Sequence, residues 1–261
     1  MNKENLLMMG KARIDILNAA LSAGKSGAHI APSLSDVDIC LAVLKQFDKE
    51  KDSFILSKGH GALGYYAAMH QIGMITDEQF DSFERNGGEF PGQPSRTAHN
   101  NVEYNSGSLG MGLSYGLGVA IAKKSKGQVF VVLGDGELNE GSNWEAAALA
   151  SRYGLDNIIA IVDNNGLQSD GRCENITNQN LLDIWKAFGW EVKECDGHSI
   201  DCIKDVLIIE HSRKPLVILA HTIKGNGVSF MENDNSWHHA TLKEEEYQKA
   251  VNEIGERYGL S

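Results

Sequence analysis

The feature that most constrains the fold is an alternation of short apolar runs with longer segments of helical pattern. Three runs contain mainly Val, Ile, Leu and Ala, with no polar residue inside them: Val129–Leu133, Ile158–Val162 and Leu216–Ala220. Such continuous runs are typical of strands that are buried on both faces of a parallel sheet. A shorter run, Trp190–Val192, predicts a further strand in the same sheet.

Segments with helical patterns surround these runs. Strands that alternate with helices predict an α/β fold, here a doubly wound and mostly parallel sheet with helices on both faces. We find no repeat, low-complexity segment or linker, so we expect residues 1–261 to form a single domain. The expected helices are Lys3–Ala23, one capped by Ser35, one following Gly61, Gly107–Lys124, Glu140–Tyr153, Leu181–Phe188, Ile203–His211 and Leu242–Tyr258. A long loop, Arg85–Tyr104, is expected between them, and loops of this length are often functional.

The composition excludes several classes of protein. Lys and Arg number 24 against 35 Asp and Glu, and the resulting net charge of −11 disfavours binding to nucleic acid or an anionic membrane. No apolar stretch approaches the roughly 18 residues of a membrane span, and the amino terminus lacks the pattern of a signal peptide. We expect a cytoplasmic protein whose cysteines are reduced packing residues without CxxC spacing: Cys40, Cys173, Cys195 and Cys202.

Polar residues and glycines follow two of the predicted strands where each strand ends. Asp135 stands in GDG after the first run, and Asn165 stands in DNNG about thirty residues later, which is one strand–helix–strand unit. Because ligands bind outside the carboxyl ends of parallel strands, we expect the two side chains to lie together. Carboxylate, amide and carbonyl oxygens suit a hard cation such as Mg²⁺. Each motif alone also fits an ordinary turn, whereas an EF-hand fails because Gln168 stands where its glycine is required.

Three of the nine histidines lie in turns that packing alone explains poorly. His29 lies in GAHIAPSLSDVDI, His60 in SKGHG and His238 in SWHHATL. Imidazole exchanges protons near neutral pH, so these side chains are candidates for proton transfer, although any single one also fits a role in stabilising its turn.

Two further features are suited to binding phosphate. SGSLGMG (Ser106–Gly112) predicts a glycine-rich helix start whose free N–H groups face a polar ligand, or a helix that packs closely. Lys224, beyond the strand Leu216–Ala220, could offer a point charge to phosphate or lie in solvent.

Together these motifs resemble the transketolases, a family of thiamine-diphosphate enzymes, from about His29 to Leu242. The resemblance implies that Asp135, Asn165 and the backbone carbonyl of Leu167 bind a divalent cation (Mg²⁺, or alternatively Ca²⁺ or Mn²⁺), which anchors the cofactor diphosphate. Other residues that it implicates in binding thiamine diphosphate are His29, His60, Gly107, Ser108, Leu109, Gly136, Lys224 and His238.

The resemblance also implies roles in catalysis. His29, His60 and His238 would transfer protons, and His29, Gln93 and His238 would contact a ketose substrate, expected to be phosphorylated. Gln93 stands in GQPS where the family usually has GHPE, and an amide can hydrogen-bond a hydroxyl but cannot exchange a proton. The identity of the ketose is therefore open, including a branched or sulfonated sugar instead of an ordinary pentose-phosphate intermediate. Glu140 matches a family glutamate at the dimer interface, or compensates a helix N-terminus.

The chain resembles the N-terminal half of a transketolase that is split into two chains. This resemblance implies a C-terminal partner subunit that carries the pyrimidine-binding domain, an α₂β₂ assembly, and no ketol transfer by the chain alone. Another thiamine-diphosphate enzyme (a 2-oxoacid dehydrogenase or deoxyxylulose-phosphate synthase type) and a non-catalytic binding module of the same fold are alternatives. A nicotinamide-binding protein is disfavoured because no GxGxxG joins a first strand to a helix.

Overall fold

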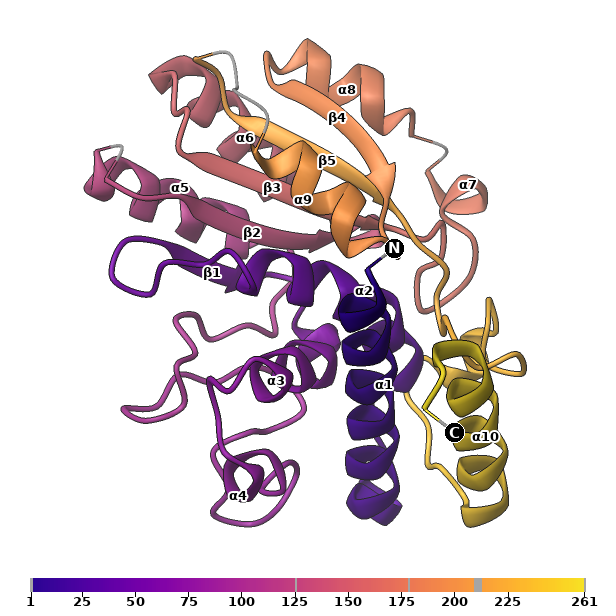
Figure 1. Cartoon of the computed structure of the whole chain (residues 1–261). Coiled ribbons are helices and arrows are strands. Elements are labelled where there is room, and N and C mark those ends of the chain that lie inside the picture. The colour runs from indigo at the N-terminus through magenta and orange to yellow at the C-terminus, as the bar shows by residue number, and fades with distance from the viewer. Residues whose placement is uncertain (1, 125, 178, 209–212, 261) are drawn as a thin grey trace.

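A computed structural model describes residues 2–124, 126–177, 179–208 and 213–260 (Figure 1). Its sheet has five strands in the order β1-β2-β3-β5-β4, and every neighbouring pair is parallel. The strands are β1 (Ser53–Leu56), β2 (Val129–Gly134), β3 (Ile158–Asn164), β4 (Glu191–Asp196) and β5 (Leu216–His221). The predicted α/β class with a parallel sheet is confirmed.

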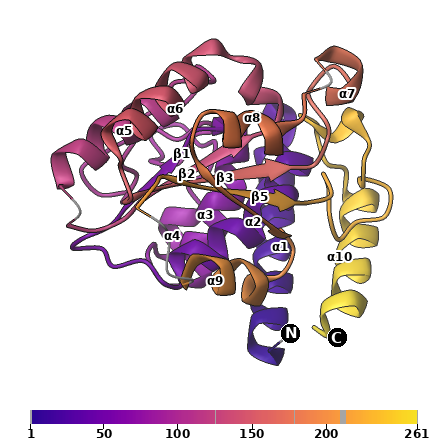
Figure 2. The ribbon, with the colours of Figure 1, turned by 90° about the horizontal axis from the view of Figure 1, so that it is seen from above.

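Helices cover both faces of this sheet, as the view from above shows (Figure 2). One face packs against α1, α2, α3 and α9, with α10 beside α1, and the other packs against α5, α6 and α8. The helices are α1 (Lys3–Ala23), α2 (Ile30–Leu44), α3 (Ala62–Gln71), α4 (Asp77–Phe80), α5 (Gly112–Lys123), α6 (Gly141–Tyr153), α7 (Cys173–Ile176), α8 (Leu181–Ala187), α9 (Ile200–Ile208) and α10 (Glu244–Tyr258).

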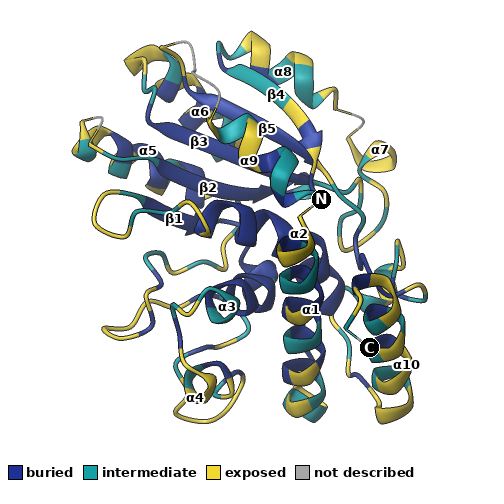
Figure 3. Ribbon diagram, in the orientation of Figure 1, coloured by how far each residue is buried: buried dark blue, intermediate teal, exposed yellow. Residues whose placement is uncertain are grey.

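The apolar runs are continuous because the central strands are buried on both sides (Figure 3). In β2, Phe130 and Val132 enter the cluster on the α2 side, while Val131 and Leu133 enter the cluster on the α5 side. Successive side chains of a strand point to opposite faces, so both sets must be apolar. At the edge of the sheet, β4 is only partly buried, and its sequence is correspondingly mixed.

Several predicted boundaries were wrong. The second helix begins at Ile30, so Ser35 is an interior residue and not its cap; its hydroxyl donates to Asp163 instead. The fifth helix begins at Gly112, which leaves SGSLG in a loop before it. The strand Ser53–Leu56 was not predicted, and the strand expected at Trp190–Val192 runs over Glu191–Asp196.

Two further boundaries differ from those expected, and other predictions about the chain were sound. The last helix begins at Glu244, and α9 begins at Ile200, while the end expected at His211 lies outside the described residues. The long loop before α5 is present. Within the described ranges the four cysteines are free, and no helix is both long and apolar enough to cross a membrane.

Candidate active site

The predicted metal ligands lie at one edge of the sheet. Strands β2 and β3 are neighbours with Gly134 opposite Asp163, so the loops that follow them lie side by side. The Asp135 carboxylate accepts N–H bonds from Gly136 at 2.7 Å and Gly166 at 2.5 Å. The Asn165 amide oxygen accepts from the Leu167 N–H at 2.9 Å, which folds the second loop back toward the first.

A cavity opens between these loops and the histidine-bearing turns. Its lining includes the three predicted metal ligands, Asp135, Asn165 and Leu167. It also includes most of the residues predicted to contact the cofactor: His60, Leu109, Gly136, Lys224 and His238. His29, Gly107, Ser108 and Gln93 do not line this cavity, although the His29 ring lies against the other histidines.

The histidines meet because two distant segments pair through their backbones. Ala28 and Ala240 exchange two N–H···O bonds of 2.9 and 3.0 Å, which brings the loop before α10 to the start of α2. The ring centroid of His29 is then 6.2 Å from that of His60 and 5.5 Å from that of His238, and those of His60 and His238 are 5.3 Å apart.

These imidazoles are neutral at pH 7. Burial, helped by neighbouring imidazoles and lysines, lowers the pKa of His29 to about 4 and that of His238 to about 3. Burial, followed by Lys58, also lowers the pKa of His60 well below its ordinary value. The His238 Nδ1 is buried and has no hydrogen-bond partner among the described residues, so it can pair with a ligand.

The glycines around His60 are required by close packing. A Cβ on Gly59 would lie 2.2 Å from the Gln93 Oε1, and one on Gly61 would lie 1.7 Å from an Asp36 carboxylate oxygen. Both are far inside van der Waals contact, so no side chain fits at either position. The GHG motif therefore allows the turn to press between α2 and the long loop, and it fixes where His60 points.

Two groups of opposite charge in the cavity lack partners. Lys224 is buried, and its Nζ donates to two neutral oxygens, the Gln168 carbonyl and the Asn235 side chain, both at 3.1 Å. Burial and then Lys58 lower the pKa of Lys224 to about 8. Burial and then Asp163 raise the pKa of Asp135 to about 6. No ion pair in the described part of the chain includes Lys224 or Asp135.

This arrangement fits a metal-bound diphosphate. A cation beside Asp135 and an anion beside Lys224 would compensate both buried charges, and an uncompensated buried charge is costly. Asp135, the Asn165 amide and the Leu167 carbonyl offer the oxygen ligands that Mg²⁺ prefers. Within the described ranges no cluster of three or more His, Cys, Asp and Glu side chains could hold a metal. A mixed set of carboxylate, amide and backbone ligands differs from such a cluster.

A buried ion pair beneath the cavity was not predicted. The Lys58 ammonium contacts the carboxylates of Asp163 and, at 3.1 Å, Asp36, and all three side chains are almost fully buried. Asp163 also accepts from Ser35 at 2.7 Å and from Thr222. Lys58 and Asp163 stand inside the SKGHG and DNNG motifs, but sequence gives no sign of burial because Lys and Asp are rarely buried.

Glu137 was also missed, although it stands next to GDG. It is buried, and its carboxylate accepts from the Ser57 hydroxyl, from the Gly110 N–H at 2.8 Å and from the Gly134 N–H at 3.1 Å. It thereby ties the SGSLG loop to the ends of β1 and β2. Glu140, in contrast, is exposed before α6 and makes no side-chain capping bond, so helix capping does not explain it.

Gln93 lies beside the histidine turn and outside the cavity lining. Its Oε1 and the Ser106 Oγ are buried, and neither has a hydrogen-bond partner among the described residues. Both atoms crowd Gly59, at 2.2 and 2.6 Å from where its Cβ would stand. Two unpaired polar atoms next to His60 are placed where a polar substrate group could bind them.

Comparisons with known proteins agree with this geometry. Residues 24–260 match the family model described as the thiamine diphosphate binding domain of transketolase. One of the two chains of an apulose-4-phosphate transketolase from Actinobacillus succinogenes is 41% identical over 258 residues, covering 94% of this chain and 92% of that protein. A 6-deoxy-6-sulfo-D-fructose transketolase subunit from a Clostridium species is 36% identical, covering 88% of this chain and 90% of that protein.

The fold is also similar to that of solved transketolases. The structure of transketolase from Campylobacter jejuni superposes with a TM-score of 0.87 at 27% identity, over 98% of this chain. This chain spans only 43% of that enzyme. From the family match and the two relatives, we conclude that the chain belongs to the transketolase family, as a thiamine-diphosphate-binding domain.

Proposed function

We propose that this chain is the cofactor-diphosphate-binding subunit of a two-chain transketolase, which transfers a two-carbon ketol unit from a ketose to an aldose acceptor. The observation that carries the proposal is the pair of uncompensated buried charges, Asp135 and Lys224, in one cavity. A divalent cation held by Asp135, Asn165 and the Leu167 carbonyl, together with the diphosphate, would compensate both. The neutral histidines adjoin that cavity on the side where a substrate must approach.

Each set of residues would have a distinct part in the reaction. Thiamine diphosphate, when bound, supplies the electron sink that the ketol unit needs. His29, His60 and His238 would hold and move protons of the sugar hydroxyls, and the unpaired His238 Nδ1 is a ready acceptor. Because lysine charge contributes to lowering the pKa values of these histidines, an anionic diphosphate beside Lys224 would raise them toward neutrality.

The proposal includes a partner chain, because two of the relatives that match most of this chain are each named as one subunit of a transketolase. The outer face of α5 fits an interface with that partner. Its exposed residues carry no charge before the last turn: Met111, Tyr115, Gly118, Ile121 and Ala122. The neighbouring α6 adds the exposed Leu149 and Tyr153. Exposed apolar patches of this kind mark interaction sites, and this one adjoins the SGSLG loop and Glu140. The expected α₂β₂ stoichiometry belongs to the same proposal.

The substrate class follows from the neutral side chain at position 93. Gln93 and Ser106 offer an amide and a hydroxyl where the family usually has a histidine. The relatives are named for apulose 4-phosphate, a branched sugar, and for a sulfonated fructose. We therefore propose an uncommon ketose donor of the branched or sulfonated kind instead of an ordinary pentose phosphate.

The test is a reconstitution of the chain with its partner subunit. With thiamine diphosphate and Mg²⁺, the pair should transfer ketol units from a branched or sulfonated ketose to an aldehyde. Turnover of a 2-oxoacid in place of a ketose would assign the pair to another thiamine-diphosphate reaction. Cofactor binding without either turnover would favour a non-catalytic module.

A further inference from the structure

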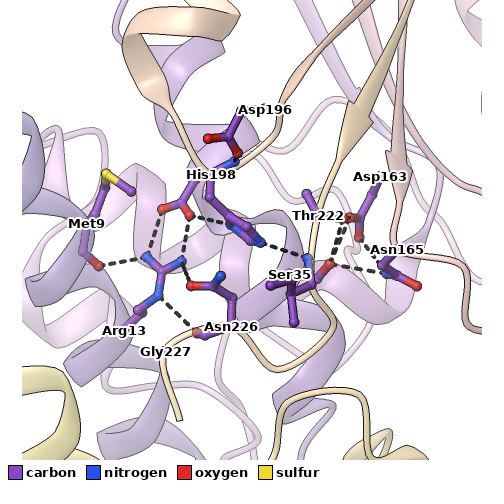
Figure 4. A network of polar contacts seen from close by, with 12 residues as sticks. Met9, Arg13, Ser35, Asp163, Asn165, Asp196, His198, Thr222, Asn226 and Gly227 are labelled. Carbon is purple, nitrogen blue, oxygen red and sulfur yellow. Dashed lines mark hydrogen bonds and ion pairs between the residues drawn. The ribbon is translucent and has the colours of Figure 1, made fainter. Parts of the chain in front are cut away.

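A buried polar network connects α1 to the segment that carries Lys224, called here the 222–227 segment (Thr222–Gly227) (Figure 4). At its centre is His198, in the turn between β4 and α9, with a side chain only 14% exposed. Its Nδ1 lies 2.8 Å from an Asp38 carboxylate oxygen, and its Nε2 lies 2.8 Å from the backbone nitrogen of Ile223. His198 is far from the three histidines of the cavity in sequence, and the proposed reaction does not use it.

The neighbours of His198 determine its tautomer. A backbone N–H can only donate, so Nε2 must be the unprotonated acceptor for Ile223, and the ring proton must lie on Nδ1 facing Asp38. Asp38 is fully buried and is held by a two-pronged pair with the Arg13 guanidinium, one contact of which is 2.7 Å. Burial would raise the pKa of Asp38, but Arg13 lowers it overall, so Asp38 stays an acceptor.

Arg13 also grips the far end of the 222–227 segment. Its Nε donates to the Asn226 carbonyl at 3.1 Å, and a guanidinium nitrogen reaches the Asn226 side-chain oxygen at 3.3 Å. Gly227 has φ +104, and a Cβ there would lie 3.1 Å from Arg13, so the chain can pass this close only as glycine. One buried arginine thus holds Asn226 directly and His198 through Asp38.

The near end of the segment is fixed to the proposed metal site. The Thr222 hydroxyl donates to Asp163, and Ser35 donates to the same carboxylate at 2.7 Å. The Asn165 amide nitrogen donates to the Ser35 hydroxyl at 3.1 Å (Figure 4). Between these anchors, the Ile223 N–H is the backbone donor immediately before Lys224, and His198 is its acceptor.

We propose that His198 is a positioning residue which, through the Ile223 N–H, holds the 222–227 segment so that Lys224 faces the cofactor diphosphate. Arg13 and Asp38 keep His198 in the tautomer that accepts this bond. The inference rests on the proposed function, since it takes the diphosphate to be the partner of Lys224. Its structural half, the constraint on the Ile223 N–H, does not depend on any ligand.

Two variants separate the two ring nitrogens. His198→Gln can place an amide oxygen near the Nε2 position and keep an acceptor for Ile223. His198→Asn can donate to Asp38 as Nδ1 does but is too short to reach Ile223. Both remove the same ring, so both should lose similar thermal stability. A residue that only packs would make the two variants equivalent.

Two measurements on the complex with the partner chain test the proposal. Hydrogen exchange of the peptide that contains Ile223 should accelerate in His198→Asn and stay near wild type in His198→Gln. The Kd for thiamine diphosphate with Mg²⁺ should rise about five- to tenfold in His198→Asn, as expected for one lost net hydrogen bond, and about twofold or less in His198→Gln. Equal exchange and equal Kd in the two variants would overturn the proposal.

The outcomes also distinguish this inference from the proposed function. If the wild-type complex binds the cofactor and His198→Asn matches it in both measurements, only the positioning role is wrong. If the wild-type complex does not bind the cofactor with Mg²⁺, the proposed function fails, and with it the claim that Lys224 is aimed at a diphosphate. The exchange rates then still decide whether His198 fixes the Ile223 N–H.

Discussion

Asp135 and Lys224 are buried at a cost in stability that a ligand can offset. Both line one cavity, and in the described part of the chain neither has an ion-pair partner. Lys58, by contrast, is buried beside two carboxylates, Asp36 and Asp163. A buried charge that is left unpaired is retained at the expense of stability, and binding of an opposite charge is the physical reason to retain it.

We therefore expect Asp135→Asn and Lys224→Met to weaken cofactor binding without lowering stability. Each removes a charge that the diphosphate or its metal would compensate, so the Kd for thiamine diphosphate with Mg²⁺ should rise at least about tenfold, or roughly 1.4 kcal/mol. Calorimetric titration of the complex gives the Kd, and its Tm without cofactor should be unchanged or higher. A lowered Tm together with an unchanged Kd would show that these residues are structural.

The lowered pKa of Lys224 predicts a pH dependence. Its pKa is about 8 when the site is empty, against an ordinary value of 10.5, so the ammonium loses its proton as the pH rises through 8. The affinity for the diphosphate should then fall, while the empty protein gains stability between about pH 8 and 10.5, because there the unfolded state binds more protons. Lys224→Arg stays charged, so it should remove the alkaline loss of affinity. An equal loss in both proteins would assign the effect to another group.

At the scale of single elements, Glu137 fixes the geometry of one loop. It joins the loop before α5 to the ends of β1 and β2 through three accepted hydrogen bonds. Glu137→Gln has the same shape but turns one acceptor into a donor that faces an N–H or O–H group. We expect it to lower the free energy of unfolding by about 1–3 kcal/mol, measured by urea denaturation. An unchanged unfolding free energy would contradict this role, and Glu140→Gln, at an exposed neighbouring site, is the matched control.

The outer face of α5 gives a second prediction at this scale. Tyr115→Asp and Ile121→Asp alter side chains that are 40% and 44% exposed, so the isolated chain should stay folded. Assembly with the partner should be lost, as measured by analytical ultracentrifugation, because a charge would be buried at the interface. Ile208→Asp, at a 63% exposed site on α9, is the control and should assemble normally. Normal assembly of both α5 variants would place the interface elsewhere.

Sequence predicted the elements that packing specifies and missed those that depend on long-range contacts. The strands β2, β3 and β5 were found because burial on both faces requires apolar residues throughout. The strand β1 has only four residues and follows a charged segment, so its pattern is too short to detect. Ser35 has the chemistry of a helix cap, but its partner is Asp163, which is distant in sequence.

The candidate site divides along the same line. The motifs located Asp135, Asn165, His60 and Lys224, which line one cavity as expected. Local pattern could not show that Lys58 is buried between two carboxylates, because each partner comes from a different element. The exposed position of Gly107 also depends on where α5 begins, which the sequence placed too early.

For the whole molecule, the structure contains one side of a proposed active site. The sheet edge supplies the metal and diphosphate ligands, the start of α2 and the loop before α10 supply histidines, and the neutral face of α5 lies alongside. We expect the isolated chain to show no ketol transfer and the reconstituted pair to show it. Transfer by the isolated chain, measured by release of the aldose, would contradict the need for a partner.

The central claim is that Asp135 and Asn165 share one cation, which holds a diphosphate against Lys224. Anomalous diffraction from crystals of the complex grown with Mn²⁺ and thiamine diphosphate tests it directly. We predict a single Mn²⁺ peak bound by both side chains and the Leu167 carbonyl, with a diphosphate oxygen in contact with the Lys224 ammonium. A peak bound elsewhere, or a diphosphate that lies away from Lys224, would contradict the account.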